Sequence, residues 1–347
     1  MTRKKPQTTR GSWWQRMNAR RRAFMARRPH RSFRLTRRRD YRRSLEMPGY
    51  IALTRQTVIL LWRHRQLFVK LALIYALAVF LLAGVMSQQT YEQLKTAVSE
   101  LDAEHALGSV TTVLALFAGV ASNQFTGGAA PGVANISQQV IAALVGLYIW
   151  LTAIWLLRAV LGKKQVMVRD GLYNAGAPAV ALVILFAVLL LQLLPAGMAI
   201  VTYGAVDASG LLRQTAVLML AGGAAALIVT LSVYWMTSTI FAMAIVTLPG
   251  MYPFEALRLA SDIVLGRRIR ILLRLLWMLV LLAIVWAVVL IPMIVLDGVI
   301  KGALPVLQWV PFVPLTALLL ATGSLIFAAS YTYLFYRKVV NDDSAPA

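Results

Sequence analysis

Six long apolar runs, separated by shorter polar stretches, dominate the pattern of hydrophobic and polar positions along the chain. Each run reaches the roughly 20 residues that a helix needs to cross a bilayer. Runs such as VALVILFAVLLLQLL lack the alternation of polar and apolar positions that a transmembrane β-barrel requires. The pattern predicts an all-α integral membrane protein, a six-helix transmembrane bundle. The predicted spans cover residues 67 to 86, 140 to 161, 177 to 201, 215 to 248, 271 to 295 and 310 to 336.

A further apolar stretch at residues 106 to 122 tests this count. If it crossed the membrane, the loops that carry Lys163 and Arg267 would lie outside, against the excess of positive charge expected inside. We therefore expect this stretch to form an outer helix, either at the interface or packed over the bundle.

A short amphipathic helix is predicted between the fourth and fifth spans, in PGMYPFEALRLASDIVLG at residues 249 to 266. Pro253 suits the first turn of a helix, and Gly266 is expected to end it. One stripe is polar, with Glu255, Arg258 and Asp262. The apolar stripe holds Phe254, Leu257, Ser261 and Val264. Such a helix can lie along a membrane surface, and we call it an elbow.

The elbow has a counterpart before the first span, where PGYIAL at residues 48 to 53 compares with PGMYPFEAL at 249 to 257. A weaker third copy is VRDGLY at residues 168 to 173. This pattern predicts three repeats, each with an elbow helix, an outward span, an outer loop and an inward span. The elbow cations expected at the membrane interface are Arg63, Arg267, Arg268 and Arg270.

The composition agrees with membrane residence, since 59% of the residues are hydrophobic and only 14% are charged. The net charge of +22 is concentrated in residues 1 to 49, which hold 17 Lys and Arg against Asp40 and Glu46. Residues 1 to 47 are therefore predicted to form a basic N-terminal arm that is largely disordered. Its arginine clusters are Arg20, Arg21, Arg22, Arg27, Arg28, Arg37, Arg38, Arg39, Arg42 and Arg43.

Several partners fit such an arm. Its charges suit anionic membrane lipids, and they also suit RNA or a ribosome, with Trp13 and Trp14 as stacking groups. A positive-inside anchor without a dedicated partner stays open, and so does an organellar presequence. Protein partners are not indicated.

Orientation follows from the Lys and Arg between the spans. With the amino terminus inside, the inner side receives the arm, the elbows and the loop with Lys163, Lys164 and Arg169. Both termini, including a tail at residues 341 to 347, are therefore predicted to be cytoplasmic. A bacterial plasma (inner) membrane is the expected location, with an organellar inner membrane as the less favoured one.

Groups for catalysis or metal binding are scarce. No Cys is present, and the histidines, His30, His64 and His105, have no metal-ligand spacing. The span interiors are expected to lack Asp and Glu, which argues against proton-coupled transport. The acids assigned to connections are Asp170, Asp207, Glu255 and Asp297. No cofactor, metal or enzymatic activity is predicted, and a membrane-embedded lipid transferase is the one enzyme class left open.

Hydroxyl side chains in two spans could line a polar interior. They are Thr237 and Ser238 in the fourth span, and Thr322 and Ser324 in the sixth. Because Ser and Thr in membrane helices commonly bond their own helix or a neighbour, packing is the favoured interpretation.

The segment PFEALRLASDIVLGRRIRILLRLL at residues 253 to 276, with the spacing of spans between residues 50 and 340, resembles a group of uncharacterised bacterial six-span proteins. These are related to the membrane domain attached to some glycerophosphodiester phosphodiesterases. The resemblance implies a helical membrane domain and no activity.

The leading hypothesis is a non-enzymatic polytopic inner-membrane protein with a scaffold, assembly or envelope-maintenance role. Its basic arm would engage anionic lipid, RNA or a ribosome. The alternative is a transporter or permease subunit for a lipid or small apolar solute, because repeated hairpins with cavities between them are common in transporters.

Overall fold

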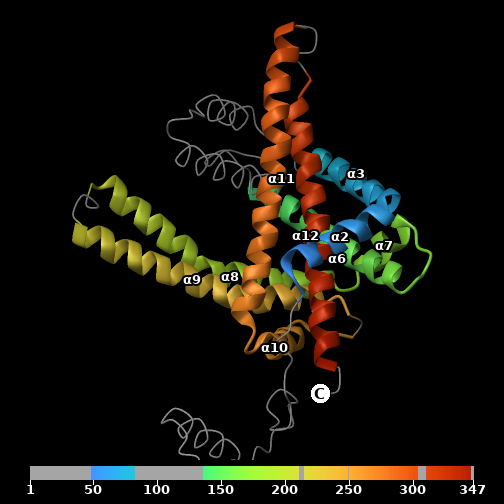
Figure 1. Ribbon diagram of the computed structural model, residues 1–347, viewed down its shortest axis with the longest axis horizontal. Helices are drawn as coiled ribbons and strands as arrows, with labels where there is room; N and C mark the ends of the chain where they lie inside the picture. The colour runs from blue at the N-terminus through green and yellow to red at the C-terminus, as the bar shows by residue number, and fades with distance from the viewer. Residues whose placement is uncertain (1–47, 83–135, 211–214, 249, 304–309, 345–347) are drawn as a thin grey trace, which may run out of the picture. The chain divides into compact units, whose positions relative to one another are not determined.

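The computed structural model describes residues 48–82, 136–210, 215–248, 250–303 and 310–344, in which every regular element is an α-helix. The helices are α2 (Tyr50–Arg63), α3 (Arg65–Leu82), α6 (Ile136–Leu161), α7 (Val168–Ala175), α8 (Ala179–Ala208), α9 (Thr215–Ile245), α10 (Pro253–Val264), α11 (Arg268–Ala303) and α12 (Phe312–Ser344) (Figure 1). Six of them, α3, α6, α8, α9, α11 and α12, are long and apolar enough to cross a bilayer. The chain is an all-α six-helix membrane bundle, as predicted.

The predicted spans match these six helices, but several helices are longer than predicted. The helix α8 ends at residue 208 instead of 201, and α11 ends at residue 303 instead of 295. Each contains a proline, at position 195 or 292, as the predicted spans do. Proline is tolerated inside membrane helices because neighbouring groups can satisfy the freed carbonyl. At the other end of the chain, α12 continues to residue 344, into the predicted tail. The predicted outer helix at 106 to 122 and the arm lie outside the described residues.

A short helix precedes each of α3, α8 and α11, namely α2, α7 and α10. As predicted, α10 begins at Pro253, and the chain turns at Gly266, whose φ of 80° favours glycine. Of the predicted apolar stripe, Phe254 is 72% exposed and Val264 is fully buried. Ala256 and Ala260, which the prediction did not include, are also fully buried. Small side chains at this spacing let α10 approach α9, its main neighbour.

The centre of the packing is α12, which contacts α2, α3, α6, α9 and α11 (Figure 1). Most of its neighbours are apolar, and α6 supplies a fully buried series that includes Leu156 and Leu157. An edge-on pair of rings, Phe241 and Phe335 with centroids 5.4 Å apart, joins α9 to α12. A smaller apolar cluster around Trp286 joins α11 to the first half of α12.

The helices α8 and α9 form a hairpin and pack mainly against each other (Figure 1). A hydrogen bond of 2.7 Å from the Thr239 hydroxyl to the Gln192 side-chain oxygen joins them. We use the term distal hairpin for residues 190–208 and 215–231. Most large apolar side chains there are exposed, such as Leu191 at 68% and Leu220 at 77%. Exposed apolar side chains on a membrane span are those that face lipid tails.

Candidate functional site

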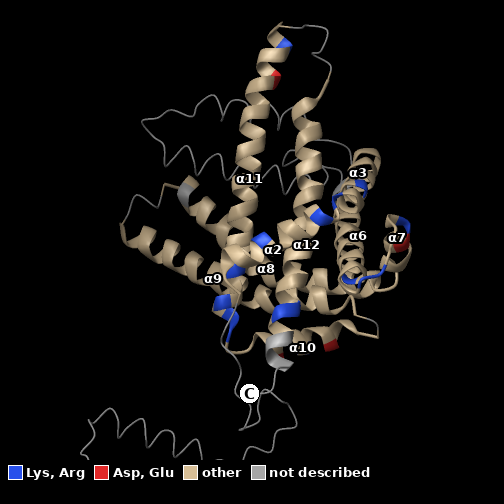
Figure 2. Cartoon of the chain, turned by 45° about the vertical axis from the view of Figure 1, so that its right-hand side comes forward, with Lys and Arg blue, Asp and Glu red and all other residues tan. Residues whose placement is uncertain are grey.

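Cations gather at one end of the helical domain (Figure 2). At this end α3, α8 and α11 begin and α6, α9 and α12 end, and we call it the basic end. Of the described Lys and Arg residues, all except Lys301 lie on α2, α7 or α10, in the connections, or within about two turns of these helix ends. The distribution is the one that the positive-inside rule predicts for a cytoplasmic face.

The predicted elbow cations occupy two different turns of the chain. Arg63 is exposed at the end of α2. The other three belong to the turn from α10 to α11, where Arg267 is 1% exposed and Arg270 is exposed. Arg268 stacks on α9, with its guanidinium carbon 5.0 Å from the centre of the Tyr234 ring. Because Arg267 is almost fully buried, its side chain is packed within the protein.

A cation that the sequence analysis did not single out, Arg274 on α11, makes several polar contacts at the basic end. It is 7% exposed. Its Nε donates a hydrogen bond of 2.9 Å to the Pro48 carbonyl, and Nη1 donates one of 2.8 Å to the Arg270 carbonyl. Its guanidinium carbon lies 5.0 Å from the Tyr50 ring centre and 5.9 Å from that of Phe335. We call Arg274 with Pro48, Tyr50 and Phe335 the Arg274 clamp.

Neighbouring side chains extend the clamp across three helices. The Trp277 indole donates a hydrogen bond of 3.2 Å to the Thr54 hydroxyl, and its ring meets the Tyr50 ring edge-on at 6.1 Å. From α12, the Tyr331 hydroxyl donates a hydrogen bond of 3.3 Å to the Arg274 carbonyl. The start of α2 is thereby joined to both α11 and α12.

Two adjoining cavities open at the basic end and share Trp155 and Arg158. The smaller one has a volume of about 410 Å³, and we call it the Arg158 pocket. Its lining consists of Trp155, Arg158, Ala159, Leu161, Gly162, Lys164, Tyr333 and Arg337. The larger cavity, of about 610 Å³, lies between the end of α6, the start of α8 and the connection from α9 to α10. Arg158 is half-buried between them and donates a hydrogen bond of 3.3 Å to the Thr247 carbonyl.

No family model, curated protein or solved structure matches this chain. The resemblance to the membrane domain of glycerophosphodiester phosphodiesterases therefore stays a prediction.

The hydroxyls predicted for a polar interior bond mainly within their own helices. The Thr237 hydroxyl donates to the Val233 carbonyl at 3.1 Å, and the Thr322 hydroxyl donates to the carbonyl four residues earlier. Ser238 also bonds its own helix. Ser324 differs, because its hydroxyl accepts a hydrogen bond of 2.9 Å from the Trp286 indole across the α11–α12 contact. These bonds agree with a packing role for the four side chains.

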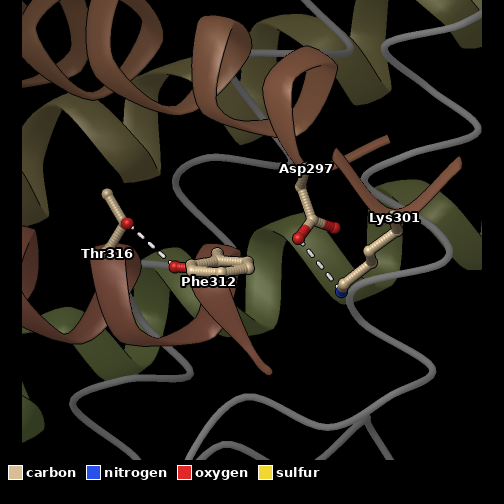
Figure 3. Close-up of polar contacts among 4 residues, drawn as sticks. All are labelled: Asp297, Lys301, Phe312 and Thr316. Atoms are coloured by element: carbon tan, nitrogen blue, oxygen red, sulfur yellow. Dashed lines mark hydrogen bonds and ion pairs between the residues drawn. The ribbon is translucent and has the colours of Figure 1, made fainter. Parts of the chain in front are cut away.

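Asp297 lies inside a helix, contrary to the expectation that it sits in a connection. The fifth span was predicted to end at residue 295, whereas α11 ends at residue 303, so Asp297 belongs to the helix, where it is fully buried. Its carboxylate forms an ion pair of 3.0 Å with Lys301, one helical turn later (Figure 3). On α12 the Thr316 hydroxyl, also drawn there, donates to the Phe312 carbonyl. A buried acid beside a cation on the same helix satisfies its charge locally.

Groups that could bind a metal do not cluster in the described ranges, where no three His, Cys, Asp or Glu side chains lie together. His64 lies in the turn between α2 and α3. The other two histidines and the ten arm arginines lie outside these ranges. The cations gathered at the basic end form an arrangement that suits anions.

Proposed function

We propose that the six-helix domain is a non-enzymatic membrane anchor for residues 1–47. In this proposal the arm works at the cytoplasmic face of a bacterial plasma membrane, where its arginines engage anionic lipid, RNA or a ribosome. The role is one of scaffold, assembly or envelope maintenance.

The Arg274 clamp is the observation that carries this proposal. Pro48 is the first described residue after the arm, and its carbonyl is held by a buried guanidinium at 2.9 Å. Burying a cation costs desolvation free energy, which hydrogen bonds and aromatic contacts must offset. The hydrogen bonds and ring contacts of the Arg274 clamp offset this desolvation free energy, and they do so at Pro48, directly after the arm. An anchor requires such a fixed junction, whereas a loose positive tail does not.

Two further observations support the orientation and the three-unit organisation. The described cations gather at the basic end, which becomes the cytoplasmic face under the positive-inside rule. The short helices α2, α7 and α10 each precede a span that starts from that end. Both facts favour three elbow-and-hairpin units with the arm inside.

The experiment compares three full-length proteins: wild type, a variant with the ten clustered arm arginines changed to Gln, and one with the same residues changed to Lys. Each is purified in mild detergent, and the bound phospholipid, RNA and ribosomal protein are quantified. Lipid docking depends on charge, so the Lys variant keeps its lipid while the Gln variant loses most of it. Specific RNA recognition uses the planar guanidinium, so both variants lose RNA.

Equal amounts of every bound molecule in all three proteins would contradict the proposal. Membrane insertion, checked by resistance to alkaline extraction, serves as the control that the six-helix domain is intact.

A second candidate, transport of a lipid or small apolar solute, is favoured by a cavity of about 360 Å³ between α8 and α9 in the distal hairpin. Its walls are almost entirely apolar and include Pro195 and Ala225. Filling this cavity with Ala225→Leu would reduce flux into reconstituted vesicles. Thr237→Val and Thr322→Val are matched controls, because both hydroxyls bond their own helices. Equal flux in the Ala225→Leu variant and wild type would count against transport through this cavity.

A further inference from the structure

The Arg158 pocket gathers three cations from two parts of the chain. Arg158 lies near the end of α6 and Lys164 follows that helix, while Arg337 comes from the last turns of α12. The contact between α6 and α12 brings them to one cavity of about 410 Å³. Cations of separate origin therefore surround a space large enough for a small polar group.

The residues that line this pocket and the adjoining cavity include no Asp or Glu. Among the acids whose side chains the structure describes, none forms an ion pair with Arg158, Lys164 or Arg337. Like charges that share a partly desolvated cavity repel each other. A bound anion converts this repulsion into attraction, so the pocket favours an anionic ligand.

The geometry of Arg158 suits a phosphate group. The bond from its Nη1 to the Thr247 carbonyl fixes the guanidinium between the two cavities. Its other N–H groups have no hydrogen-bond partner among the described residues, so they can donate to a ligand. The planar guanidinium can bind two phosphate oxygens together, while Lys164 adds a compact charge. Tyr333 lines the same pocket.

The neighbouring cavity provides the second half of a binding site. Its volume is about 610 Å³, and most of its wall is apolar, with Leu151, Ile184 and Val246 among the lining residues. Arg158 and Trp155 border both cavities. A molecule with a phosphate and an apolar chain could therefore occupy the two cavities at once. Trp155 at the junction and Tyr333 in the Arg158 pocket are of the residue types typical of a membrane interface, where one end of a ligand is wet and the other apolar.

We propose that the Arg158 pocket binds the phosphate of an anionic phospholipid and that the adjoining cavity takes the start of its acyl chain. The proposal depends on membrane residence alone and is independent of what the arm binds. It assigns a defined lipid site to the helical domain, separate from the general attraction of basic residues to a charged surface.

The test uses the full-length protein in mild detergent, with lipid binding followed by native mass spectrometry and by thermal stabilisation. Four probes are compared: dioleoylphosphatidylglycerol, dioleoylphosphatidylcholine, glycerol phosphate and inorganic phosphate. Phosphatidylglycerol is expected to bind one site saturably and to raise the melting temperature, with the soluble phosphates much weaker. The R158Q variant should bind it roughly tenfold more weakly, because a charge-assisted pair of hydrogen bonds is lost.

The matched control is R169Q, which removes an exposed cation on α7 that lines neither cavity. It should bind phosphatidylglycerol as wild type does. R158K tests the shape of the binding group, since it keeps the charge but not the planar fork, and it should be intermediate. If R158Q fails to fold, K164Q and R337Q give the same test from exposed positions.

Three results would overturn the proposal. Equal losses in R158Q and R169Q would show attraction to the basic end as a whole. Equal affinity for glycerol phosphate and phosphatidylglycerol would assign the pocket to a soluble phosphate compound. If none of the four probes bound saturably, the pocket would not be a site for an anionic phospholipid. In the variant without arm arginines, binding at this site should persist, so the arm and the pocket can fail separately.

Discussion

The helix α6 and the distal hairpin are both continuously apolar, yet they differ in what surrounds them. On α6, Leu156 and Leu157 are fully buried by other helices, whereas Leu191 and Leu220 in the distal hairpin are largely exposed. In a bilayer, apolar side chains gain little by leaving lipid for protein, so hydrophobicity alone does not bring membrane helices together. The difference teaches that membrane residence and helix packing are separate properties, set by different features of the sequence.

The largest effect is expected from truncating one leucine in each region. Leu157→Ala should leave a cavity in the apolar core around α6 and lower the free energy of unfolding by about 2 to 5 kcal/mol. Leu220→Ala should cost well under that, because lipid fills the space. Unfolding by SDS titration in mixed micelles measures both. Equal losses of unfolding free energy in the two variants would contradict this difference, since they would show that the distal hairpin is also packed within protein.

Next in size is the effect of removing the polar contacts that join distant helices. Arg274→Gln should lower the free energy of unfolding by about 2 to 3 kcal/mol, because the Pro48 and Arg270 carbonyls both lose a charged donor. Gln192→Leu breaks the one side-chain bond that joins α8 to α9 among the described residues. Its expected loss is about 0.6 kcal/mol, the average for such bonds in membranes. If Gln192→Leu lowered the free energy of unfolding as much as Arg274→Gln, the polar contact between α8 and α9 would matter as much to stability as the contacts of Arg274.

Two glycines, Gly171 on α7 and Gly223 on α9, differ in the space around them. A Cβ added to Gly171 on α7 would lie 2.7 Å from the Leu156 side chain, whereas one added to Gly223 would meet nothing within 4 Å. Gly171→Ala is therefore expected to cost about 1 to 3 kcal/mol through overpacking. Gly223→Ala should be neutral or stabilising by up to about 1 kcal/mol, since alanine favours helix. Thermal midpoints of the two variants in one detergent check this, and a neutral Gly171→Ala would rule out the close α6–α7 contact.

The smallest effect concerns two serines of similar sequence context. Ser324→Ala removes the acceptor of the Trp286 indole between α11 and α12, with an expected loss of about 0.6 kcal/mol. Ser238→Ala removes only a bond to the carbonyl of Trp235 on the same helix and should be close to neutral. The same SDS titration distinguishes them. A larger loss for Ser238→Ala would indicate an interhelical role for its hydroxyl.

Membrane residence and the six spans found among the described residues could be predicted, because both depend on the length of apolar runs. The helix ends were less predictable. The fifth span was predicted to end at residue 295, but α11 continues to residue 303 and includes Asp297. A proline in a membrane helix does not expose backbone to water, so its usual penalty is reduced.

Helix packing could not be read from the sequence, because uniformly apolar spans have no stripe that marks the buried side. The buried stripe of α10, with Ala256 and Ala260, was missed for a related reason. Small residues matter there for close approach to α9, and a search for large apolar side chains overlooks them.

The candidate site was partly visible in the sequence. Arg158 and Arg274 are cations within or at the ends of apolar runs, and such residues are usually functional or paired. Their partners were not visible. Arg274 bonds a carbonyl 226 residues earlier in the chain, and the Arg158 pocket depends on the contact between α6 and α12. Both arrangements exist only after the helices have packed.

The bond from Arg274 to Pro48 also sets a limit on distance. Whatever conformation the preceding 47 residues adopt, a fully extended chain of that length reaches at most about 160 Å from its fixed point. In the proposed function, a molecule captured by residues 1–47 is confined to a layer of about that depth beside the basic end. Its search for a second partner takes place within that layer, and the local concentration of two such molecules rises without any change in affinity.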